Sequence, residues 1–557
     1  MSNGHENALA PNAHRLLWAG FFAILAAGIG FGVRGGILFN WKDEFGFSDT
    51  ELGNIGGAGL TGFCVGIFIG GLIVDRIGYG KLVIAAFLFH ILSAVVTFAA
   101  SEGQSQAVAY NYLYWGMFIF AIANGTLEAV ANPLVATLFP HKRTHYLNLL
   151  HASWPAGLVV GGAIGWFLGD GLGWHWKMQL ALFLVPTVFY GLMFLGQKMP
   201  KSVAAEQGLS LGEMFRDVGL LGGLVACALV ALFIKDAVGP MLKLVTGVEL
   251  FGQMGFWWVA LAIAGALWAL IGVVTKGSLG HALLFVLFFA HALVGSVELG
   301  TDTWMQNAMG NLLTPTEGKI LFVFTSAIMF ILRFFADWIE SRLKISPVGI
   351  LLICAVLASA GLFLTSRIET FLGAMFALAV YAVGKTFFWP TMLAVVGDRF
   401  PRTGAVAMSL IGGIGMMAGG LIGAAGLGYA KDRFTAEHLK QTAPDVFATY
   451  AVQNESDFKS FLYFDSVQVV DGKRLGQIQD KLDKIRKTRA SNKEDIRGAI
   501  DDLDQDERLV KKSSEAGDRE MLRIDAYIPA ALAVIFAGIF VYFMTIGGYR
   551  PVRISGD

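Results

Sequence analysis

Asn124, Glu128 and Asn132 place three polar side chains inside an apolar run that extends from residue 113 to residue 139. Because an α-helix has about 3.6 residues per turn, this spacing by fours puts them on one side of a helix. A charged side chain at the centre of a bilayer costs roughly 2.5–3.5 kcal/mol to insert, so it usually faces a water-filled path or a partner charge. Burial also favours the neutral form of a carboxyl group, which makes Glu128 the candidate for carrying a transported proton. The alternative is a protonated Glu128 that only holds helices together.

Four more charged side chains fall inside apolar runs, and their depths suggest partners. Counting about 1.5 Å per helical residue places Arg34, Glu298 and Asp302 near the outer ends of their helices. Because their charges are opposite, we expect Arg34 to approach Glu298 or Asp302. Lys385 lies deeper, where we expect it to face Glu128. The alternative is that these charges form static structural pairs, since breaking a buried pair is costly.

The composition places the whole chain in a membrane. Of its 557 residues 55% are hydrophobic and only 15% are charged, and the formal net charge is zero, which argues against a nucleic-acid partner. The three cysteines have no spacing that suggests a metal site or a disulfide. Motifs for nucleotide binding, zinc or a nucleophilic serine are also missing from the sequence. We therefore expect a protein in contact with the lipid bilayer that is not an enzyme and needs no cofactor or metal.

About fourteen apolar runs are long enough to span a bilayer as helices. They are residues 16–39, 51–74, 81–100, 111–139, 145–168, 176–196, 217–234, 251–274, 281–307, 318–343, 348–364, 370–397, 404–429 and 527–546. An even number puts both termini on one side of the membrane. Lys and Arg gather in alternate short loops, which marks that side as the cytoplasm of a cell (inner) membrane protein.

Two loops repeat between the first six runs and the last six. Residues 71–81 are answered by residues 333–344, and residues 139–143 by residues 400–404, at nearly the same separation. Such an internal repeat is typical of transporters built from two halves. We therefore expect a cytoplasmic tail at 1–15, a six-helix bundle at 16–200, a linker with two extra transmembrane helices at 201–278 and a second bundle at 279–557.

The second bundle is interrupted by a polar insert at residues 431–525, which parity places outside the cell. Its first half carries apolar residues at heptad spacing, namely Leu475, Ile478, Leu482 and Ile485. Ser491 followed by Glu494 has the pattern of a capping box that starts a second helix. The sequence thus predicts a helical hairpin. Three roles stay open for it: a cover over the outer mouth, a binding site for an envelope partner, or a solvated charged spacer.

The loop at residues 71–81 resembles the signature loop of the major facilitator superfamily. That resemblance implies an all-α membrane fold of two pseudo-symmetric six-helix bundles, here with two inserted central helices. In the family the acid of this loop sits near the start of the eleventh helix, which would put Asp75 beside residues 403–405. The resemblance implies a cytoplasmic latch made of charged loop residues, namely Asp75, Arg76, Asp337 and Arg342. It also implies that the first and seventh helices adjoin, so we expect Arg34 to form an outer gate with Glu298 or Asp302 that closes when the protein faces inward.

Residues 128–133, 147–151 and 388–391 are similar to the fucose permease branch of that superfamily, although Arg34 stands near the place of an acid in the first helix of that branch. This resemblance implies a monomeric transporter that moves a sugar or related polyol together with protons. Amides bond hydroxyl groups and aromatic faces pack against sugar rings. The expected substrate-binding residues are Asn124, Asn132, His151, Trp154, His291, Glu298, Asp302, Trp304, Tyr381, Lys385 and Trp389.

Three other functions remain open from the sequence. The chain could export an amphiphilic compound or carry a sugar–peptide fragment, since the same polar and aromatic side chains suit such solutes. A different class of function is a transporter-like sensor whose outer hairpin signals through a partner.

Overall fold

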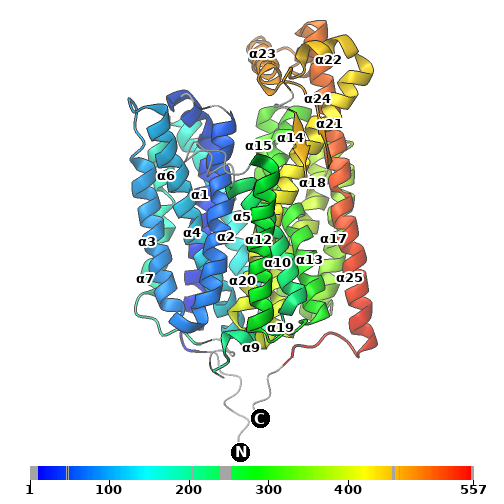
Figure 1. The fold of residues 1–557 in the computed structure, drawn as a ribbon. Coiled ribbons are helices and arrows are strands. Elements are labelled where there is room, and N and C mark those ends of the chain that lie inside the picture. Colours follow the sequence, from blue (N-terminus) through cyan, green and yellow to red (C-terminus); the bar gives the residue numbers. More distant parts are fainter. Residues whose placement is uncertain are drawn as a thin grey trace, which may run out of the picture.

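The computed structural model describes residues 10–45, 47, 49–201, 206, 208–238, 252–454, 458–462 and 464–552. The first nine residues of the expected tail and residues 239–251 of the expected linker lie outside this part. Two helical bundles stand side by side, and α1 begins and α25 ends at the same end of the molecule, which we call the terminus side (Figure 1). A small domain rises from the second bundle at the opposite end, the insert side.

The first bundle contains six spans. They are α1 (Ala13–Phe45), α2 (Asp49–Ile77), α3 (Tyr79–Phe98), α4 (Gln106–Leu138), α5 (Arg143–Ile164) with the π-helical turn η1 (Gly165–Gly171), and α6 (Trp176–Ala181) with α7 (Leu184–Phe194). Small residues bring α1 and α5 together, because a Cβ on Gly28 would lie 2.6 Å from the carbonyl oxygen of Trp154.

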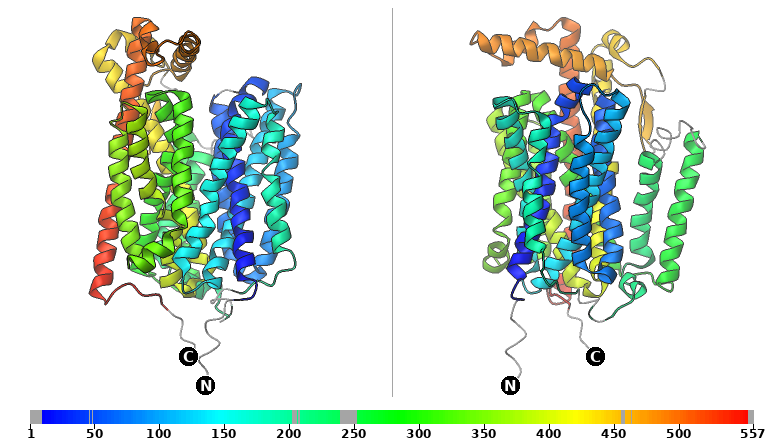
Figure 2. Two further views of the ribbon diagram at one scale, coloured as in Figure 1. Left: turned by 180° about the vertical axis from the view of Figure 1, so that it is seen from behind. Right: turned by 90° about the vertical axis from the view of Figure 1, so that its left-hand side faces the viewer.

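The linker adds two apolar helices beside the bundles. A short helix α9 (Leu211–Phe215) precedes α10 (Gly219–Phe233), which ends in the π-helical turn η2 (Ile234–Val238), and α12 (Gly252–Val274) follows. Figure 2 shows this pair standing at one side of the molecule. A Cβ on Gly222 of α10 would meet the ring of Phe288, so α10 packs against the first helix of the second bundle.

The second bundle is built from longer and more interrupted helices. The first run consists of α13 (Ala282–Gly295), η3 (Ser296–Gly300) and α14 (Thr301–Leu312), and the second of α15 (Pro315–Arg333) followed by α16 (Ala336–Arg342). The third is α17 (Pro347–Thr365), and the fourth is α18 (Phe371–Lys385) with α19 (Phe388–Arg399). The fifth consists of η4 (Pro401–Thr403), α20 (Ala405–Ala418), η5 (Gly419–Ala424) and α21 (Ala425–Thr442), and the sixth is α25 (Tyr527–Thr545). The first and fifth of these runs touch backbone to backbone, because a Cβ on Gly295 would lie 2.0 Å from the carbonyl oxygen of Gly415.

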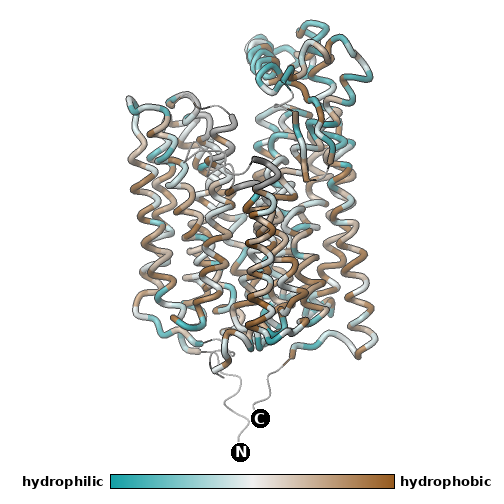
Figure 3. The backbone as a smooth tube through the Cα atoms, viewed as in Figure 1, coloured by the Kyte–Doolittle hydropathy of each residue, from teal (hydrophilic) through white to brown (hydrophobic). Residues whose placement is uncertain are grey.

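Within the described residues, thirteen helices are long and apolar enough to cross a membrane, and Gly219–Phe233 is a shorter apolar helix. The fourteen expected runs therefore all reappear as helices, one of them short. Figure 3 shows the hydrophobic residues along the two bundles and the hydrophilic residues concentrated in the domain on the insert side.

The insert folds into a domain with a core of its own. It contains the end of α21, α22 (Pro444–Tyr450), the antiparallel strands β1 (Lys459–Phe461) and β2 (Phe464–Val467), α23 (Gly472–Ser491), η7 (Arg497–Asp502) and α24 (Gln505–Asp525). Leu439, Phe447, Leu482 and Val510 are buried together in this core. The heptad residues do lie in one helix, α23, but the domain is more than the expected hairpin.

The capping box expected at Ser491 is wrong. Helix α23 continues through Ser491, and a 3-10 segment separates it from the next helix. That helix, α24, is instead capped by Asp504, whose Oδ1 accepts from the backbone N–H of Glu507 at 2.8 Å. The two motifs look alike in sequence, and only the second is followed by a long amphipathic run that packs on the domain core.

Candidate functional site

Glu128 lies on α4 near the boundary between the two bundles and is buried. Asn132 donates from Nδ2 to Glu128 Oε2 at 3.4 Å, and its Oδ1 accepts from His151 Nε2 at 2.8 Å. In the part of the chain that the structure describes, no basic nitrogen lies within ion-pair distance of Glu128. The nearby charges that act on it are those of Glu298 and Arg333, both from the second bundle. The structure thus holds a buried carboxyl group without a direct counter-ion.

Asn124 is directed elsewhere, although it belongs to the same helix. Its Oδ1 accepts from His90 Nε2 at 2.8 Å, and His90 Nδ1 accepts from the hydroxyl of Tyr190 at 2.9 Å. Because four-residue steps drift by about 40° each, Asn124 and Asn132 are roughly 80° apart around the helix axis. The structure therefore separates Asn124, which joins helices inside the first bundle, from the pair Glu128 and Asn132.

Arg333 is the central residue that the sequence reasoning missed. Its side chain is buried at the end of α15, where Nη2 lies 3.1 Å from Glu298 Oε1 and Nε donates to the carbonyl of Thr386 at 2.9 Å. Its Nη1 donates to the carbonyl oxygen of His151 in the first bundle. Arg333 therefore joins the two halves at the site. The charge balance of the second bundle could have pointed to Arg333. Its apolar runs contain two acids, Glu298 and Asp302, and Lys385 can pair with only one of them.

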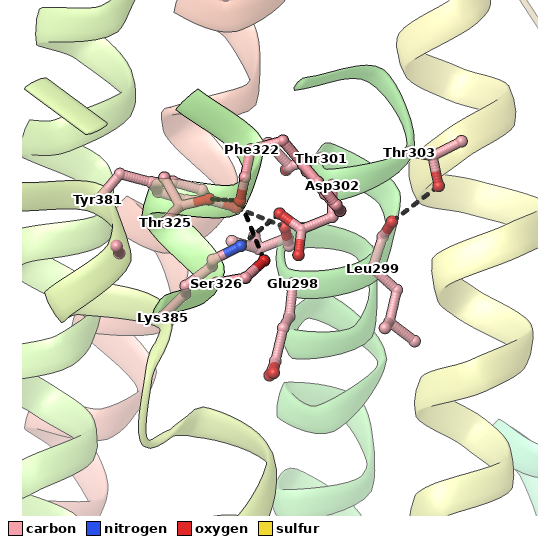
Figure 4. A network of polar contacts seen from close by, with 12 residues as sticks. Glu298, Leu299, Thr301, Asp302, Thr303, Phe322, Thr325, Ser326, Tyr381 and Lys385 are labelled. Carbon is pink, nitrogen blue, oxygen red and sulfur yellow. Dashed lines mark hydrogen bonds and ion pairs between the residues drawn. The ribbon is translucent and has the colours of Figure 1, made fainter. Parts of the chain in front are cut away.

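The expected pair between Lys385 and Glu128 is wrong. Lys385 forms its ion pair with Asp302 of its own bundle, next to the ring of Tyr381, whose hydroxyl donates to the carbonyl of Val297 at 2.9 Å (Figure 4). The prediction failed because it placed Glu298 and Asp302 too close to the outer end of their helix. The run α13–η3–α14 reaches Leu312, whereas the apolar run in the sequence ends at residue 307. Glu298 and Asp302 therefore lie in the middle of this run, not near its outer end, and at the depth of Lys385.

Several polar atoms in the same region have no hydrogen-bond partner among the described residues. They belong to Glu298 Oε2, to both ring nitrogens of His291 and to Trp389 Nε1. The rings of His291 and Trp389 are 4.6 Å apart. Buried polar groups are nearly always hydrogen-bonded, so these atoms require water or a ligand. We define the central site as Glu128, Asn132, His151, His291, Glu298, Arg333 and Trp389.

The two other expected tryptophans lie around this site and not in it. Trp154 is partly buried and its ring is 5.3 Å from that of Phe31. Trp304 donates from Nε1 to the carbonyl of Ala424 at 2.8 Å and lies near Lys431, towards the insert domain.

Charged residues join the bundles at the terminus side. Arg143 Nη1 lies 2.9 Å from Asp398 Oδ1, and Lys142 lies 3.0 Å from Asp337. Asp75 Oδ2 accepts from the backbone N–H of Ala405 at 3.1 Å, which places it beside the start of α20. Arg76 and Arg342 are exposed and take part in no ion pair within the described chain. We call the contacts of Asp75, Lys142, Arg143, Asp337 and Asp398 the latch; Arg143 and Asp398 were not among the expected gating residues.

Arg34 is buried and has no carboxylate partner within the described residues. Its guanidinium carbon lies 3.9 Å from the ring centre of Phe120, and Nη1 donates to the carbonyl of Gly30 at 3.2 Å. Nε and Nη2 have no partner in the part of the chain that is described. Glu298 and Asp302 hold other cations here, while the latch is closed. The outer gate, which was expected to close in the inward-facing state, stays a prediction.

A separate cavity of about 520 Å³ lies in the first bundle on the insert side. Its lining includes Glu44 of α1, Gln179 of α6, Glu102 from the loop before α4, and Trp174 and His175 from the segment before α6. It shares no residue with the central site. Trp176 donates from Nε1 to Glu44 at 2.5 Å beside it.

Comparisons with known proteins agree with this architecture. A family model described as Major Facilitator Superfamily matches residues 20–424. The fold is similar to a major facilitator transporter, FucP, in the outward conformation, with TM-score 0.53 and 15% identity over 76% of this chain and 92% of that one. It is also similar to the proton:xylose symporter XylE bound to 6-bromo-6-deoxy-D-glucose, with TM-score 0.51 and 14% identity over 73% and 86%.

Two curated proteins match a shorter stretch. The putative niacin/nicotinamide transporter NiaP of Bacillus subtilis is 31% identical over 162 residues, which are 28% of this chain and 37% of that protein. The 4-hydroxybenzoate transporter PcaK of Acinetobacter baylyi is 24% identical over 197 residues, which are 32% of this chain and 41% of that protein. The chain thus spans less than half the length of either relative.

Proposed function

Because the chain belongs to the Major Facilitator Superfamily, we propose that it is a secondary transporter that couples the movement of a sugar or related polyol to protons. The superfamily match over residues 20–424 confirms the resemblance drawn from the loop at 71–81 and the all-α fold expected from it. The observation that carries the proposal is Glu128, a buried carboxyl group without a direct counter-ion at the boundary between the halves.

Glu128 has the chemistry that proton coupling needs. An ionised carboxylate in a low-dielectric site is costly without a paired cation, so it takes up a proton there. When the site opens to water, the carboxylate is solvated and the proton can leave. Arg333 and Glu298 belong to the opposite half and lie close enough to act on Glu128. Movement of the halves would therefore change the charge around it and couple proton release to the conformational exchange.

The rest of the central site supports a polyhydroxylated solute. His291 and Trp389 offer unpartnered donors and a flat ring surface, and Glu298 Oε2 offers an unpartnered acceptor. Sugars present hydroxyl groups that both donate and accept, together with an apolar ring face. The neighbour XylE is described as a proton:xylose symporter, which is a further reason to begin with sugars.

The closed latch supports an outward-facing conformation, provided that the terminus side is the cytoplasm of a cell (inner) membrane. Basic residues in alternate short loops favour that orientation. The superfamily neighbour FucP is in the outward conformation. We further propose that the chain works as a monomer.

A second candidate substrate is an aromatic carboxylate. The observation that favours it is Arg34, a buried guanidinium with two unpartnered nitrogens that is stacked on Phe120. Arginine binds carboxylates in bidentate fashion, and an aromatic ring would pack beside Phe120. NiaP and PcaK, which match about a third of this chain, are named for niacin and 4-hydroxybenzoate. Export of an amphiphile, transport of a sugar–peptide fragment and a sensor function remain alternatives without such an observation.

Uptake into proteoliposomes with an imposed pH gradient tests these proposals. We expect accumulation of a labelled hexose or polyol when the outside is more acidic, and none of labelled niacin or 4-hydroxybenzoate. Glu128→Gln should abolish accumulation but preserve exchange across membranes at equal pH, because a neutral side chain still permits the loaded protein to reorient. Glu437→Gln, which changes an exposed acid of the insert, is the control. Gradient-driven accumulation by Glu128→Gln would show that another group carries the proton.

A further inference from the structure

Asp525 is a buried acid outside the central site. It lies where α24, which returns from the insert domain, enters the second bundle. It is the last residue of α24, its side chain is fully buried, and α25 begins two residues later. The hydroxyl of Thr301 donates to Asp525 Oδ2 at 2.6 Å. Oδ1 has no hydrogen-bond partner within the described residues. Thr301 lies eleven residues before the end of α14, about 16 Å along the helix axis, so the carboxyl group is deep in the bundle.

The charged group that lies close to Asp525 is another acid. Helix α14 contributes this acid, Asp302, and α18 contributes the uncharged ring of Tyr381. Lys385 is already paired with Asp302, as Figure 4 shows. The remaining neighbours, on α17 and α25, add no charge. From α17 the hydroxyl of Ser359 donates to the backbone carbonyl of Ala526, and α25 has no charged residue.

The basic residues of α24 itself are engaged elsewhere. Arg519 donates to the carbonyl of Ser366, and Arg523 forms an exposed pair with Glu520. Lys431, on α21, is paired with Asp518, two turns before Asp525. Asp525 therefore has no ion-pair partner among the described residues. An uncompensated carboxylate in such a place costs several kcal/mol, whereas the neutral acid can keep the bond from Thr301 and carry its proton on the unpartnered oxygen.

We propose that Asp525 is a second proton-binding site, which holds a proton on Oδ1 while Asp302 stays ionised against Lys385. The inference does not depend on the role of Glu128 or on the identity of the solute. It has a structural consequence, because Asp525 and Lys385 are both close to Asp302. Loss of the proton from Asp525 would place a second carboxylate near Asp302, and the repulsion between the two acids would disturb the pair of Asp302 with Lys385. The site thus links the root of the insert domain to the helix that carries Glu298.

Infrared difference spectroscopy on the purified full-length protein tests the proposal directly, because a protonated carboxyl group has a carbonyl band that a carboxylate lacks. Asp525→Asn should remove one such band at neutral pH. Asp518→Asn is the matched control: the residue is buried on the same helix but paired with Lys431, so its replacement should remove none. A band of Glu128, removed by Glu128→Gln, reports the central site separately.

Thr301→Val decides which acid holds the proton. It removes the hydrogen bond to Asp525 with little change in volume, so the band assigned to Asp525 should shift in frequency. This variant also answers the question if Asp525→Asn does not fold. The proposal is overturned if Asp525→Asn removes no band or if Thr301→Val leaves every band in place, since the proton would then lie on Asp302 or be absent.

Discussion

The buried acids fall into two groups according to their partners. Glu298 and Asp302 each contact a cation of their own bundle, while Glu128 and Asp525 have none among the described residues. Paired charges hold a geometry, because separating them leaves two uncompensated ions. Unpaired carboxyl groups exchange protons, because neutralisation is the cheapest way to bury them. Under the two proposals above, Glu128 and Asp525 bind protons, while Glu298 and Asp302 hold the geometry of the second bundle.

Arg333 should be the most costly of the buried cations to remove. Arg333→Met leaves the Glu298 carboxylate buried and unpaired, and breaking a buried pair from one side costs about 3–5 kcal/mol. Thermal unfolding in detergent should show a clear drop in the melting temperature. The double variant Glu298→Leu with Arg333→Met should recover most of it. Lys142→Met, which breaks a pair that is 56% exposed on the lysine side, should change stability by less than about 1 kcal/mol. A single Arg333→Met variant as stable as the parent would show that the pair is not structural.

Glu340 makes the latch sensitive to pH. It lies on α16 between two spans, and burial, followed by the nearby carboxylate of Asp398, raises the pKa of Glu340 from 4.5 to about 6. A raised pKa means that the closed structure binds the proton more tightly than an open one. The protonated Glu340 therefore stabilises the closed latch fully below pH 4.5, and this stabilisation is lost as the pH rises through about 6.

Labelling of a cysteine placed behind the latch checks this sign. Acid slows thiol labelling everywhere, so the rate is expressed relative to a cysteine at a permanently exposed position. Between about pH 7 and about pH 5 we expect this relative rate to fall in the parent, because acid favours the closed latch. Glu340→Gln, which imitates the protonated acid, should label slowly at both values. Labelling of the parent that is faster in acid would reverse the sign and exclude this role of Glu340.

For single residues, the sequence identifies candidates for the site better than it predicts their partners. Glu128 stands out because a carboxylate in an apolar run is costly to bury. Lys385 was assigned to Glu128 by depth alone, and depth depends on helix ends that lie beyond the apolar runs. Arg333 lies inside the apolar run 318–343, but the loop repeat that begins with it drew attention away from its charge. Partners across the bundle depend on packing, which no local pattern encodes.

Among the elements, the start of α5 has the largest share in the latch. Arg143 donates to both the carbonyl of Gly397 and the carboxylate of Asp398, and only about a tenth of its side chain is exposed, at 11%. Lys142, the adjacent residue, makes a mostly exposed pair. We expect Arg143→Ala to shift the population towards the open latch and to speed labelling of a cysteine behind it several-fold, since each 1.4 kcal/mol is about tenfold in an equilibrium. Lys142→Ala should change the rate little, and equal effects of the two variants would contradict this ranking.

The positions of the spans could be predicted because an apolar run of bilayer length has few alternatives. Their ends could not, since α1 reaches Phe45 and α14 reaches Leu312, beyond the apolar residues. The π-helical turns η1, η2, η3 and η5 were also missed. Such a turn contains one extra residue compared with an α-helical turn, and hydrophobic patterns do not record it.

For the whole molecule, the repeated loops predicted two similar halves with an insert, because they recur in one register. The inner organisation of the insert domain was not predictable in the same way. Its core joins residues far apart in the sequence, such as Leu439, Leu482 and Val510. Heptad spacing predicted α23 but not the helices that pack against its apolar face.

The insert domain should tolerate damage that the bundles do not. Leu482→Ala empties a fully buried position in its core, which typically costs 2–5 kcal/mol, or about 3 kcal/mol here. We expect faster limited proteolysis within the insert and unchanged solute accumulation in proteoliposomes. Lys484→Ala, two residues away and exposed, is the control and should alter neither. Loss of accumulation in Leu482→Ala alone would instead give the domain a part in transport.

The glycine contact between α13 and α20 packs two runs of the second bundle backbone to backbone beside the central site. We expect helices packed this closely to tilt as one body. The run α20–η5–α21 continues into the insert domain, and α24 returns from it to α25. The insert domain lies far from the boundary between the bundles. A small tilt of the second bundle about that boundary should therefore displace the insert domain more than it displaces the residues near the boundary. A pair of fluorophores, one on α23 and one at the insert-side end of α3, would turn each transport cycle into a change of distance.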